Sequence, residues 1–294
     1  LIALKARLEN LDWMSPETKA KALEKLATFD PKIGYPDKWR DFTGLSIRSN
    51  DGYFGDVMAM SEFNNAWNMG KIGKPADRKE WGMSPQTVNA YYNPLKNEIV
   101  FPAAILQPPF FDPKADPALN YGGIGAVIGH EIMHGFDDQG SQFDATGKNA
   151  NWWTDADRKA FNERTAKLVK QFDDYVAVPP DVHVKGQLTL GENIGDLSGM
   201  RIAYDALQKD LENKKIGLID GMTQDQRFFM NFATIWRSNM RPEAMKVMVN
   251  SNPHAPAKFR AIASPSNMKE FADAFSCKAD DKMVRSGANQ VIIW

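Results

Sequence analysis

Cysteine is almost absent from this sequence, since Cys277 is the only one among 294 residues. One thiol cannot form a disulfide within the chain, and it cannot supply a metal site built on several cysteines. A nucleophilic cysteine would need an electropositive partner, and no motif in the sequence indicates one. An inert or unpaired thiol is therefore the favoured interpretation.

An excess of charge of one sign is also lacking, because 36 lysines and arginines nearly balance 37 aspartates and glutamates. No global field attracts nucleic acid or an anionic membrane, so no nucleic-acid partner is expected. No apolar run approaches the roughly 20 residues that span a bilayer, and no signal-peptide pattern opens the chain. The remaining composition is that of an ordinary soluble globular protein.

Helical periodicity dominates the rest of the chain. Residues 1–26 place apolar side chains at helical spacing, with a break at Ser15 and Pro16, where serine can cap a second helix. The same periodicity predicts further helices within residues 52–81, 122–136, 154–176, 191–213 and 225–240.

Strand signals are confined to one region. Residues 88–102 contain two apolar runs separated by a turn at Asn93 and Pro94, which predicts a β-hairpin. Residues 105–111 surround two prolines with large apolar side chains and are expected to line a pocket as an irregular segment. The predicted fold class is predominantly α with a small β element (α+β).

Two histidines four residues apart, His130 and His134, lie in an apolar segment with Glu131 between them. A helix places both imidazoles on one face, a geometry that fits a tetrahedral Zn²⁺ ion with one position left for water. Glu131 would take a proton from that water. The pattern alone can arise by chance in a charged helix, but an apolar setting makes unpaired polar groups costly.

A third protein ligand is needed for such a site. The chain has four histidines, so the ligand is His183, His254 or a carboxylate. Glu192 is the best candidate, because a helix that starts at Gly191 presents it together with an acid one turn later. Considered alone, these acids are typical of any helix N-terminus.

That second acid is Asp196, which is placed to orient a ligand histidine through its free ring nitrogen. Asp137, three residues beyond His134, could orient the other ligand histidine in the same way.

Several blocks of sequence occur in a fixed order around these motifs: residues 11–14 (LDWM), 88–92 (VNAYY), 99–103 (IVFPA), 105–111 (ILQPPFF), 120–125 (NYGGIG), 130–138, 190–196 and the terminal Trp294. In these blocks the chain resembles the neprilysin and endothelin-converting-enzyme type of zinc metallopeptidases. The resemblance implies a zincin fold with a thermolysin-like catalytic domain. It also implies an endopeptidase that hydrolyses oligopeptides.

The resemblance assigns a role to each site residue. It implies one zinc ion per chain, held by His130, His134 and Glu192. It implies that Glu131 is the general base and that Asp196 is an outer acid described as a proton donor. It implies that His254 stabilises the oxyanion and that Arg260 binds the substrate carbonyl. Fixed donors beside the metal suit a developing negative charge.

Substrate contacts are implied in the same way. Asn89 and Ala90 would hold the substrate strand. An apolar pocket for the residue after the scissile bond would consist of Ile105, Phe110, Val127, Ile235 and Trp236, although a core role fits these residues equally well. Cleavage on the amino side of large apolar residues is the implied preference.

The chain departs from the family pattern mainly in length, because family chains are more than twice as long. Their first half supplies most of a second helical domain, which encloses the catalytic chamber. We expect residues 1–50 to be a helical connector left from that domain and residues 51–294 to be the catalytic domain. The missing N-terminal half is then a candidate partner, and Leu1 in place of methionine is typical of a processed or truncated product.

Smaller departures concern Gly195, where the family usually carries alanine, and the scarcity of cysteine. Cys277 matches a family cysteine whose partner would lie upstream, and a single cysteine fits a bacterial-type member. An extracytoplasmic location, periplasmic or secreted, is favoured over a cytoplasmic one. The alternative to an active enzyme is a catalytically silent fragment that binds zinc and peptide. A structural zinc site would require a fourth protein ligand, and none stands at a persuasive spacing.

Overall fold

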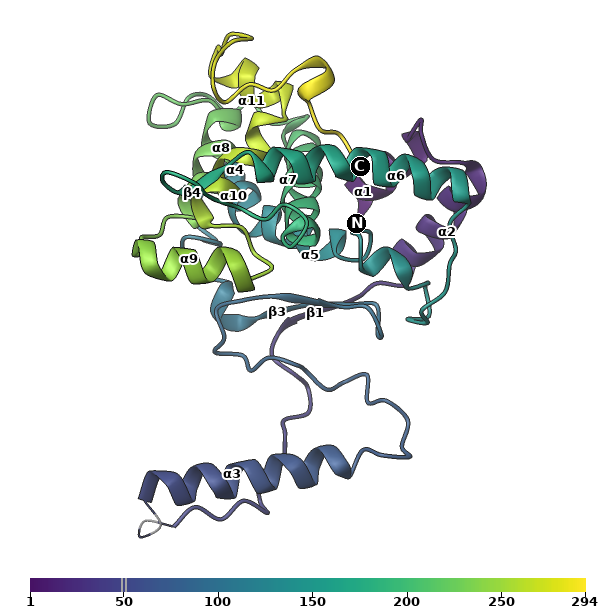
Figure 1. The fold of residues 1–294 in the computed structure, drawn as a ribbon, viewed down its shortest axis with the longest axis vertical. Helices are drawn as coiled ribbons and strands as arrows, with labels where there is room; N and C mark the ends of the chain where they lie inside the picture. The colour runs from purple at the N-terminus through teal and green to yellow at the C-terminus, as the bar shows by residue number, and fades with distance from the viewer. Residues whose placement is uncertain (49, 51) are drawn as a thin grey trace.

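The computed structural model describes residues 1–48, 50 and 52–294. Figure 1 shows a helical body from which a long arm carrying one helix extends. The body is mostly helical with a small sheet, which confirms the predicted fold class. Among the described residues, no helix is long and apolar enough to cross a membrane.

The first two helices, α1 (Ile2–Asn10) and α2 (Pro16–Ala27), confirm the predicted pair. Ser15 caps α2 by accepting a hydrogen bond from the backbone N–H of Thr18, and Pro16 occupies the first turn, where a missing N–H costs nothing. Their apolar faces are buried in the main core, at Leu4 and Leu8 on α1 and at Ala22 and Leu26 on α2. The N-terminal segment therefore packs on the body.

A three-stranded sheet has the order β1-β3-β2, from β1 (Asp30–Gly34), β2 (Tyr91–Asn93) and β3 (Glu98–Pro102). The antiparallel pair β2–β3 confirms the predicted hairpin. Strand β1 pairs parallel with β3 and was not predicted, because Pro31 and Gly34 are typical of turns. Every residue of β3 is buried, so the sheet is part of the core.

The arm lies between β1 and β2 and carries α3 (Gly52–Met69), within the region predicted to be helical. No described residue of α3 is buried, and Tyr53 and Phe54 are 86% and 77% exposed. Inside the arm, the guanidinium of Arg40 lies over the rings of Phe42, Phe63 and Trp67. The domain boundary predicted between residues 50 and 51 involves residue 51, which lies outside the described residues.

Two helices cross at the centre of the body, α5 (Ala126–Met133) and α7 (Leu190–Leu211). A Cβ atom on Gly129 would lie only 2.3 Å from the carbonyl oxygen of Gly199, so glycine is what permits this approach. The helix predicted for residues 122–136 begins earlier, as α4 (Pro117–Asn120), and continues through a π-helical turn, η2 (Tyr121–Gly125). Such turns are frequent at functional sites.

The other elements of the described residues are helices and two short strands: η1 (Ala103–Ile105), η3 (Gly140–Gln142), α6 (Asp155–Asp173), β4 (Val176–Val178), β5 (Val182–His183), α8 (Gln224–Ile235), α9 (Pro242–Ser251), α10 (Ala257–Ser266), α11 (Lys269–Ala274) and η4 (Gly287–Asn289). The helices predicted near residues 154–176, 191–213 and 225–240 correspond to α6, α7 and α8. Helix α8 ends at Ile235, five residues before its predicted end.

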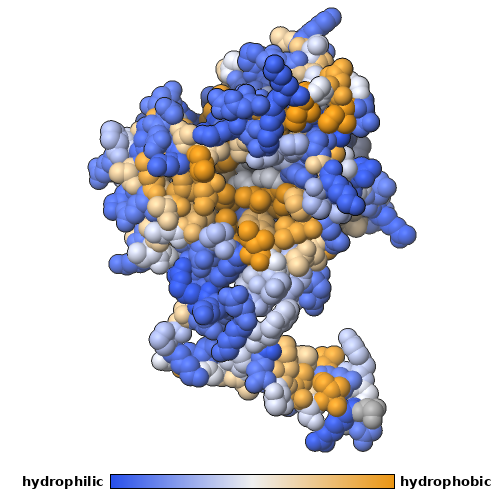
Figure 2. All heavy atoms as spheres, turned by 180° about the vertical axis from the view of Figure 1, so that it is seen from behind, coloured by the Kyte–Doolittle hydropathy of each residue, from blue (hydrophilic) through white to orange (hydrophobic). Residues whose placement is uncertain are grey.

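Apolar side chains form two core clusters. The larger one packs α1, α2, the sheet and α6 against α5 and α7, and it includes Trp153, Phe161 and the terminal Trp294. The smaller one surrounds Phe228 and Phe232 on α8. Figure 2 shows that apolar residues also gather around the middle of one face of the body and along part of the arm.

Candidate active site

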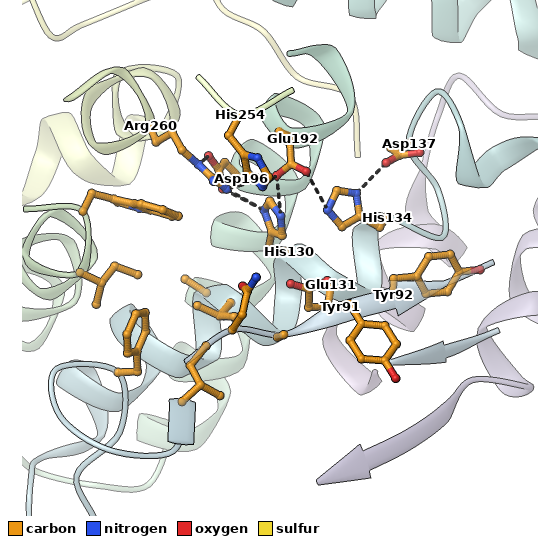
Figure 3. Close-up of a pocket in the computed structure, with 18 of the residues that line it drawn as sticks. Tyr91, Tyr92, His130, Glu131, His134, Asp137, Glu192, Asp196, His254 and Arg260 are labelled. Atoms are coloured by element: carbon orange, nitrogen blue, oxygen red, sulfur yellow. Dashed lines mark hydrogen bonds and ion pairs between the residues drawn. The ribbon is translucent and has the colours of Figure 1, made fainter. Parts of the chain in front are cut away.

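A cavity of about 640 Å³ lies beside the crossing of α5 and α7. All fifteen residues that the sequence and the resemblance assigned to the site line this one cavity, which brings together the ligand set His130, His134 and Glu192, the polar residues Glu131, Asp137, Asp196, His254 and Arg260, and the substrate residues Asn89, Ala90, Ile105, Phe110, Val127, Ile235 and Trp236. Figure 3 shows the polar side chains on one side of it.

The ligand atoms converge as a metal requires. Nε2 of His130 lies 3.2 Å from one carboxylate oxygen of Glu192, and Nε2 of His134 lies 3.7 Å from the other. The donor atoms of the three residues all lie within 4.8 Å of one another. Ligands bound at 2.0–2.2 Å around a tetrahedral zinc ion lie about 3.3–3.6 Å apart, so this set fits Zn²⁺.

Oε2 of Glu192 is buried and accepts no hydrogen bond of normal geometry from the described residues, although Nε2 of His130 and Nε2 of His254 each lie 3.2 Å from it. A buried carboxylate oxygen is costly unless good hydrogen bonds or a cation satisfy it. Zinc bound by the three residues would do so.

The other ring nitrogen of each histidine is held by a carboxylate. Nδ1 of His130 lies 2.8 Å from Asp196, and Nδ1 of His134 lies 2.7 Å from Asp137. These contacts direct Nε2 of both rings toward Glu192, which is the arrangement that metal-binding histidines usually have. The absence of a side chain at Gly195 also matters, because a Cβ atom there would lie 2.8 Å from Nδ1 of His130.

Burial and charge shift the titration of these groups. Burial disfavours the imidazolium of His130, but the carboxylates of Asp196 and Glu192, which accept hydrogen bonds from the ring, outweigh burial and raise its pKa to about 10 in the metal-free site. For Glu192, burial is outweighed by the His130 hydrogen bond and charge, which lower its pKa to about 2. Burial raises the pKa of Glu131 above its ordinary value. A raised pKa suits a carboxylate that accepts a proton.

Arg260 is buried against Asp196, with which it forms two hydrogen bonds of 2.6 Å. Its guanidinium stacks 4.0 Å from the ring centre of Trp236, and one of its nitrogens lies 3.5 Å from Glu192. Burial opposes ionisation of Asp196, but Arg260 holds the pKa of this carboxyl well below its usual range. Asp196 is therefore ionised, which suits the orientation of His130 better than the donation of a proton.

His254 lies at the rim of the cavity with 46% of its side chain exposed, and its Nε2 is 3.2 Å from Glu192. Oδ1 of Asn252 accepts hydrogen bonds from the backbone N–H of His254 and, at 2.9 Å, from its Nδ1. Because the backbone N–H can only donate, the accepting atom is the amide oxygen, and Nδ1 of His254 carries a hydrogen. Burial lowers the pKa of His254.

Sequence reasoning missed some residues of the site. Asn252 does not line the cavity but holds His254 at its rim, and its place two residues before His254 is typical of an asparagine that bonds the backbone two residues later. Tyr91, Tyr92 and Phe232 do line the cavity. They belong to a predicted strand and a predicted helix, but which face of an element meets the cavity depends on the tertiary packing.

Comparison with known proteins decides the family. Residues 89–291 match the sequence model of peptidase family M13, and residues 2–36 match a second model of the same family. The chain belongs to peptidase family M13. This finding confirms the resemblance to the neprilysin and endothelin-converting-enzyme type.

Curated M13 relatives include an endothelin-converting enzyme homolog of Locusta migratoria, 40% identical over 294 residues, and neprilysin-11 of Caenorhabditis elegans, 42% identical over 277 residues. The alignments cover 96% and 90% of this chain but only 40% and 33% of those relatives. The chain thus spans well under half the length of these M13 proteins.

Solved M13 structures share the fold. The crystal structure of Mycobacterium tuberculosis zinc metalloprotease Zmp1 with an inhibitor has a TM-score of 0.96 at 48% identity, and covers all of this chain and 45% of its own. PepO of Lactobacillus rhamnosis has a TM-score of 0.89 at 37% identity, with the same coverage. The predicted zincin-type catalytic fold is therefore confirmed.

Proposed function

We propose that this chain carries the catalytic centre of a zinc-dependent endopeptidase that hydrolyses oligopeptides, with one zinc ion per chain. The observation that carries the proposal is the convergence of His130, His134 and Glu192, whose donor atoms lie within 4.8 Å of one another. Membership of family M13 supports peptide-bond hydrolysis as the reaction.

Zinc held by these ligands would supply a Lewis acid and lower the pKa of a bound water. Glu131 lines the cavity one residue from His130, and its raised pKa suits it to take the proton of the attacking water and pass it to the leaving amine. Asp196 and Asp137 hold the two imidazoles in their ligand orientation.

Stabilisation of the tetrahedral intermediate is assigned to His254 and Arg260. Since Asn252 occupies the Nδ1 hydrogen of His254, its Nε2 can donate to an oxyanion only when the ring is an imidazolium. The developing negative charge itself favours that form. Arg260 adds a fixed positive charge at the same end of the cavity.

We further propose cleavage on the amino side of large apolar residues. The support is the apolar part of the cavity wall, where Ile105 and Phe110 of the segment 105–111 meet Trp236 at the end of α8. Asn89 and Ala90 immediately precede β2 at the same wall, where an extended substrate could pair with the backbone. Digestion of a peptide library, read by mass spectrometry, tests the preference.

The decisive experiment is a fluorogenic peptide assay on the wild type and on Glu131→Gln. Glu131→Gln is expected to bind zinc with unchanged stoichiometry and to lose activity by at least about a hundredfold, since it keeps the shape of the side chain but cannot accept the proton. Chelation should abolish wild-type activity, and added zinc should restore it. Equal activity of the two proteins would contradict the mechanism.

A second candidate is a zinc- and peptide-binding fragment without turnover. Two observations favour it. No described residue of α3 in the arm is buried, and the alignment with the Locusta migratoria relative covers only 40% of that protein. The partner that would complete the enzyme is the N-terminal half of the longer family chain. Stoichiometric zinc with no turnover in the chain alone, followed by activity on adding that half, would support this alternative. The extracytoplasmic location stays a prediction.

A further inference from the structure

Lys25 on α2 is a buried cation outside the site described above. It is only 1% exposed, and its ammonium donates three hydrogen bonds of 2.7 Å, to the backbone carbonyls of Gly135, Gly140 and Phe143. An ammonium has three hydrogens, so all of them are used. The three acceptors belong to one loop, residues 135–143, which directly follows the ligand His134.

The burial of this lysine is costly. Desolvation lowers the pKa of the Lys25 ammonium to about 7, against the opposing pull of Asp137 and Asp144. The rings of Tyr92 and Phe136 lie within 6 Å of Nζ and offer only a weak favourable interaction. A leucine or methionine would avoid this desolvation cost but would leave the three buried carbonyls without their donor. What the ammonium supplies at this position is therefore the set of hydrogen bonds that joins the loop to α2.

A short chain of contacts joins Lys25 to the metal ligands. Nζ of Lys25 binds the carbonyl of Gly140, and the backbone N–H of Gly140 donates to Oδ1 of Asp137 at 2.6 Å. Oδ2 of the same carboxylate lies 2.7 Å from Nδ1 of His134. The loop is compact at this point, because a Cβ atom on Gly140 would lie 1.7 Å from the carbonyl oxygen of His134.

We propose that Lys25 is a positioning residue of the zinc site: by binding the three carbonyls of the 135–143 loop, it holds Asp137 where it orients His134. Lys25 is not among the residues that line the cavity. It lies in residues 2–36, which match the second family model, whereas the three ligands lie in the part of the chain that matches the first. The segment expected to be a connector thus contributes to the metal centre. This inference depends on the zinc site of the proposed function.

The test measures the zinc affinity of the full chain, by competition with a chromophoric chelator, for Lys25→Met, Lys25→Gln, Asp137→Asn and the double variant Lys25→Met with Asp137→Asn. Each Lys25 variant is expected to bind zinc about tenfold to a hundredfold more weakly, as is typical of residues behind metal ligands. The double variant should be no weaker than the weaker single variant, because both changes act through His134.

The matched control is Lys21→Met on the same helix, because Lys21 is exposed and forms an ion pair with Glu24 at the surface. Its zinc affinity should equal that of the wild type. The melting temperature of each metal-free variant is recorded separately, so that loss of stability is not mistaken for loss of affinity.

Three outcomes would overturn the role of Lys25: unchanged zinc affinity in the folded Lys25 variants, additive losses in the double variant, or failure of both Lys25 variants to fold while Asp137→Asn folds. The last would make Lys25 a requirement of the fold as a whole. A wild-type chain that binds no zinc would instead contradict the proposed function, so the two failures are distinguishable.

Discussion

The α-carbons of Gly129 and Gly199 face each other where α5 crosses α7, and a Cβ atom on Gly129 would lie 2.3 Å from the carbonyl oxygen of Gly199. His130 follows Gly129 directly, and Glu192 lies two turns before Gly199 on α7. The closeness of this crossing therefore sets the distance between His130 and Glu192, two of the three proposed zinc ligands.

Gly129→Ala is expected to force the two helices apart and to destabilise the chain by about 1–3 kcal/mol, because the added methyl meets backbone that cannot move aside cheaply. Zinc affinity should fall as well. Urea unfolding and chelator competition measure the two effects. Gly217→Ala is the control, since a Cβ atom there meets nothing within 4 Å. Equal stability of the two variants would contradict the role of the crossing.

Asp196→Asn is expected to cost about 3–5 kcal/mol in the free energy of unfolding of the metal-free chain, because the buried guanidinium of Arg260 loses the charged carboxylate to which it donates two hydrogen bonds. The matched change is Asp273→Asn, which breaks an exposed ion pair with Lys269 on α11 and should leave stability nearly unchanged. Denaturant unfolding compares the two. A small effect of Asp196→Asn would show that water reaches Arg260.

Zinc binding should release protons even above neutral pH. An imidazole with the ordinary pKa is neutral at pH 8, but the pKa of His130 in the metal-free site is about 10, so the ring is still protonated and must lose its proton to bind zinc. Zinc affinity should therefore rise as pH rises toward about 10. Calorimetry at pH 8 in two buffers of different ionisation enthalpy should find about one proton or more released per zinc. Release near zero would contradict the raised pKa.

His254→Ala should lower kcat by about a hundredfold to a thousandfold, as expected for the loss of one oxyanion donor, while zinc affinity stays within about threefold of the wild type. The half-exposed position of His254 makes a large loss of stability unexpected. Steady-state kinetics and chelator competition on the same preparation separate the two quantities. A parallel loss of zinc would place His254 among the groups that hold the metal.

Phe54→Ser on α3 is expected to change the free energy of unfolding by less than about 0.5 kcal/mol, because Phe54 is 77% exposed. Phe161→Ala, at a side chain that is 1% exposed, should cost about 3–5 kcal/mol. Phe54→Ser should also reduce self-association at high concentration, as measured by sedimentation velocity, since exposed apolar patches promote association. A strongly destabilised Phe54→Ser would mean that α3 is covered in solution.

The zinc motif and most helices could be predicted because their signals are local. Each signal involves a few neighbouring residues of a single helix. These signals are the four-residue spacing of His130 and His134 in α5 and the position of Ser15 before α2. Spacing could not indicate His254 and Arg260, because both are remote in sequence from the zinc motif and only the fold brings them to it. The family resemblance indicated these two residues.

Other features of the fold could not be predicted from the sequence, because they depend on contacts between residues that are far apart in the chain. Strand β1 depends on pairing with β3, which is remote in sequence, and its own residues Pro31 and Gly34 indicate a turn. Lys25 follows the pattern of a solvated helix face, and only the position of the 135–143 loop explains why it is buried. The periodicity of α3 likewise predicts a helix but not whether any other part of the protein covers it.

Both ends of the arm return to the same place. Gly34, the last residue of β1, pairs with Pro102, and the carbonyl of Pro85 accepts a hydrogen bond of 2.9 Å from the backbone N–H of Ala104. Residues 35–84 therefore form an insertion whose two ends both contact residues 102–104. The two ends lie close together, at a separation comparable to that of neighbouring strands in a sheet. The body is topologically complete without this insertion, and a linker of a few residues could replace it without rerouting any strand of the sheet.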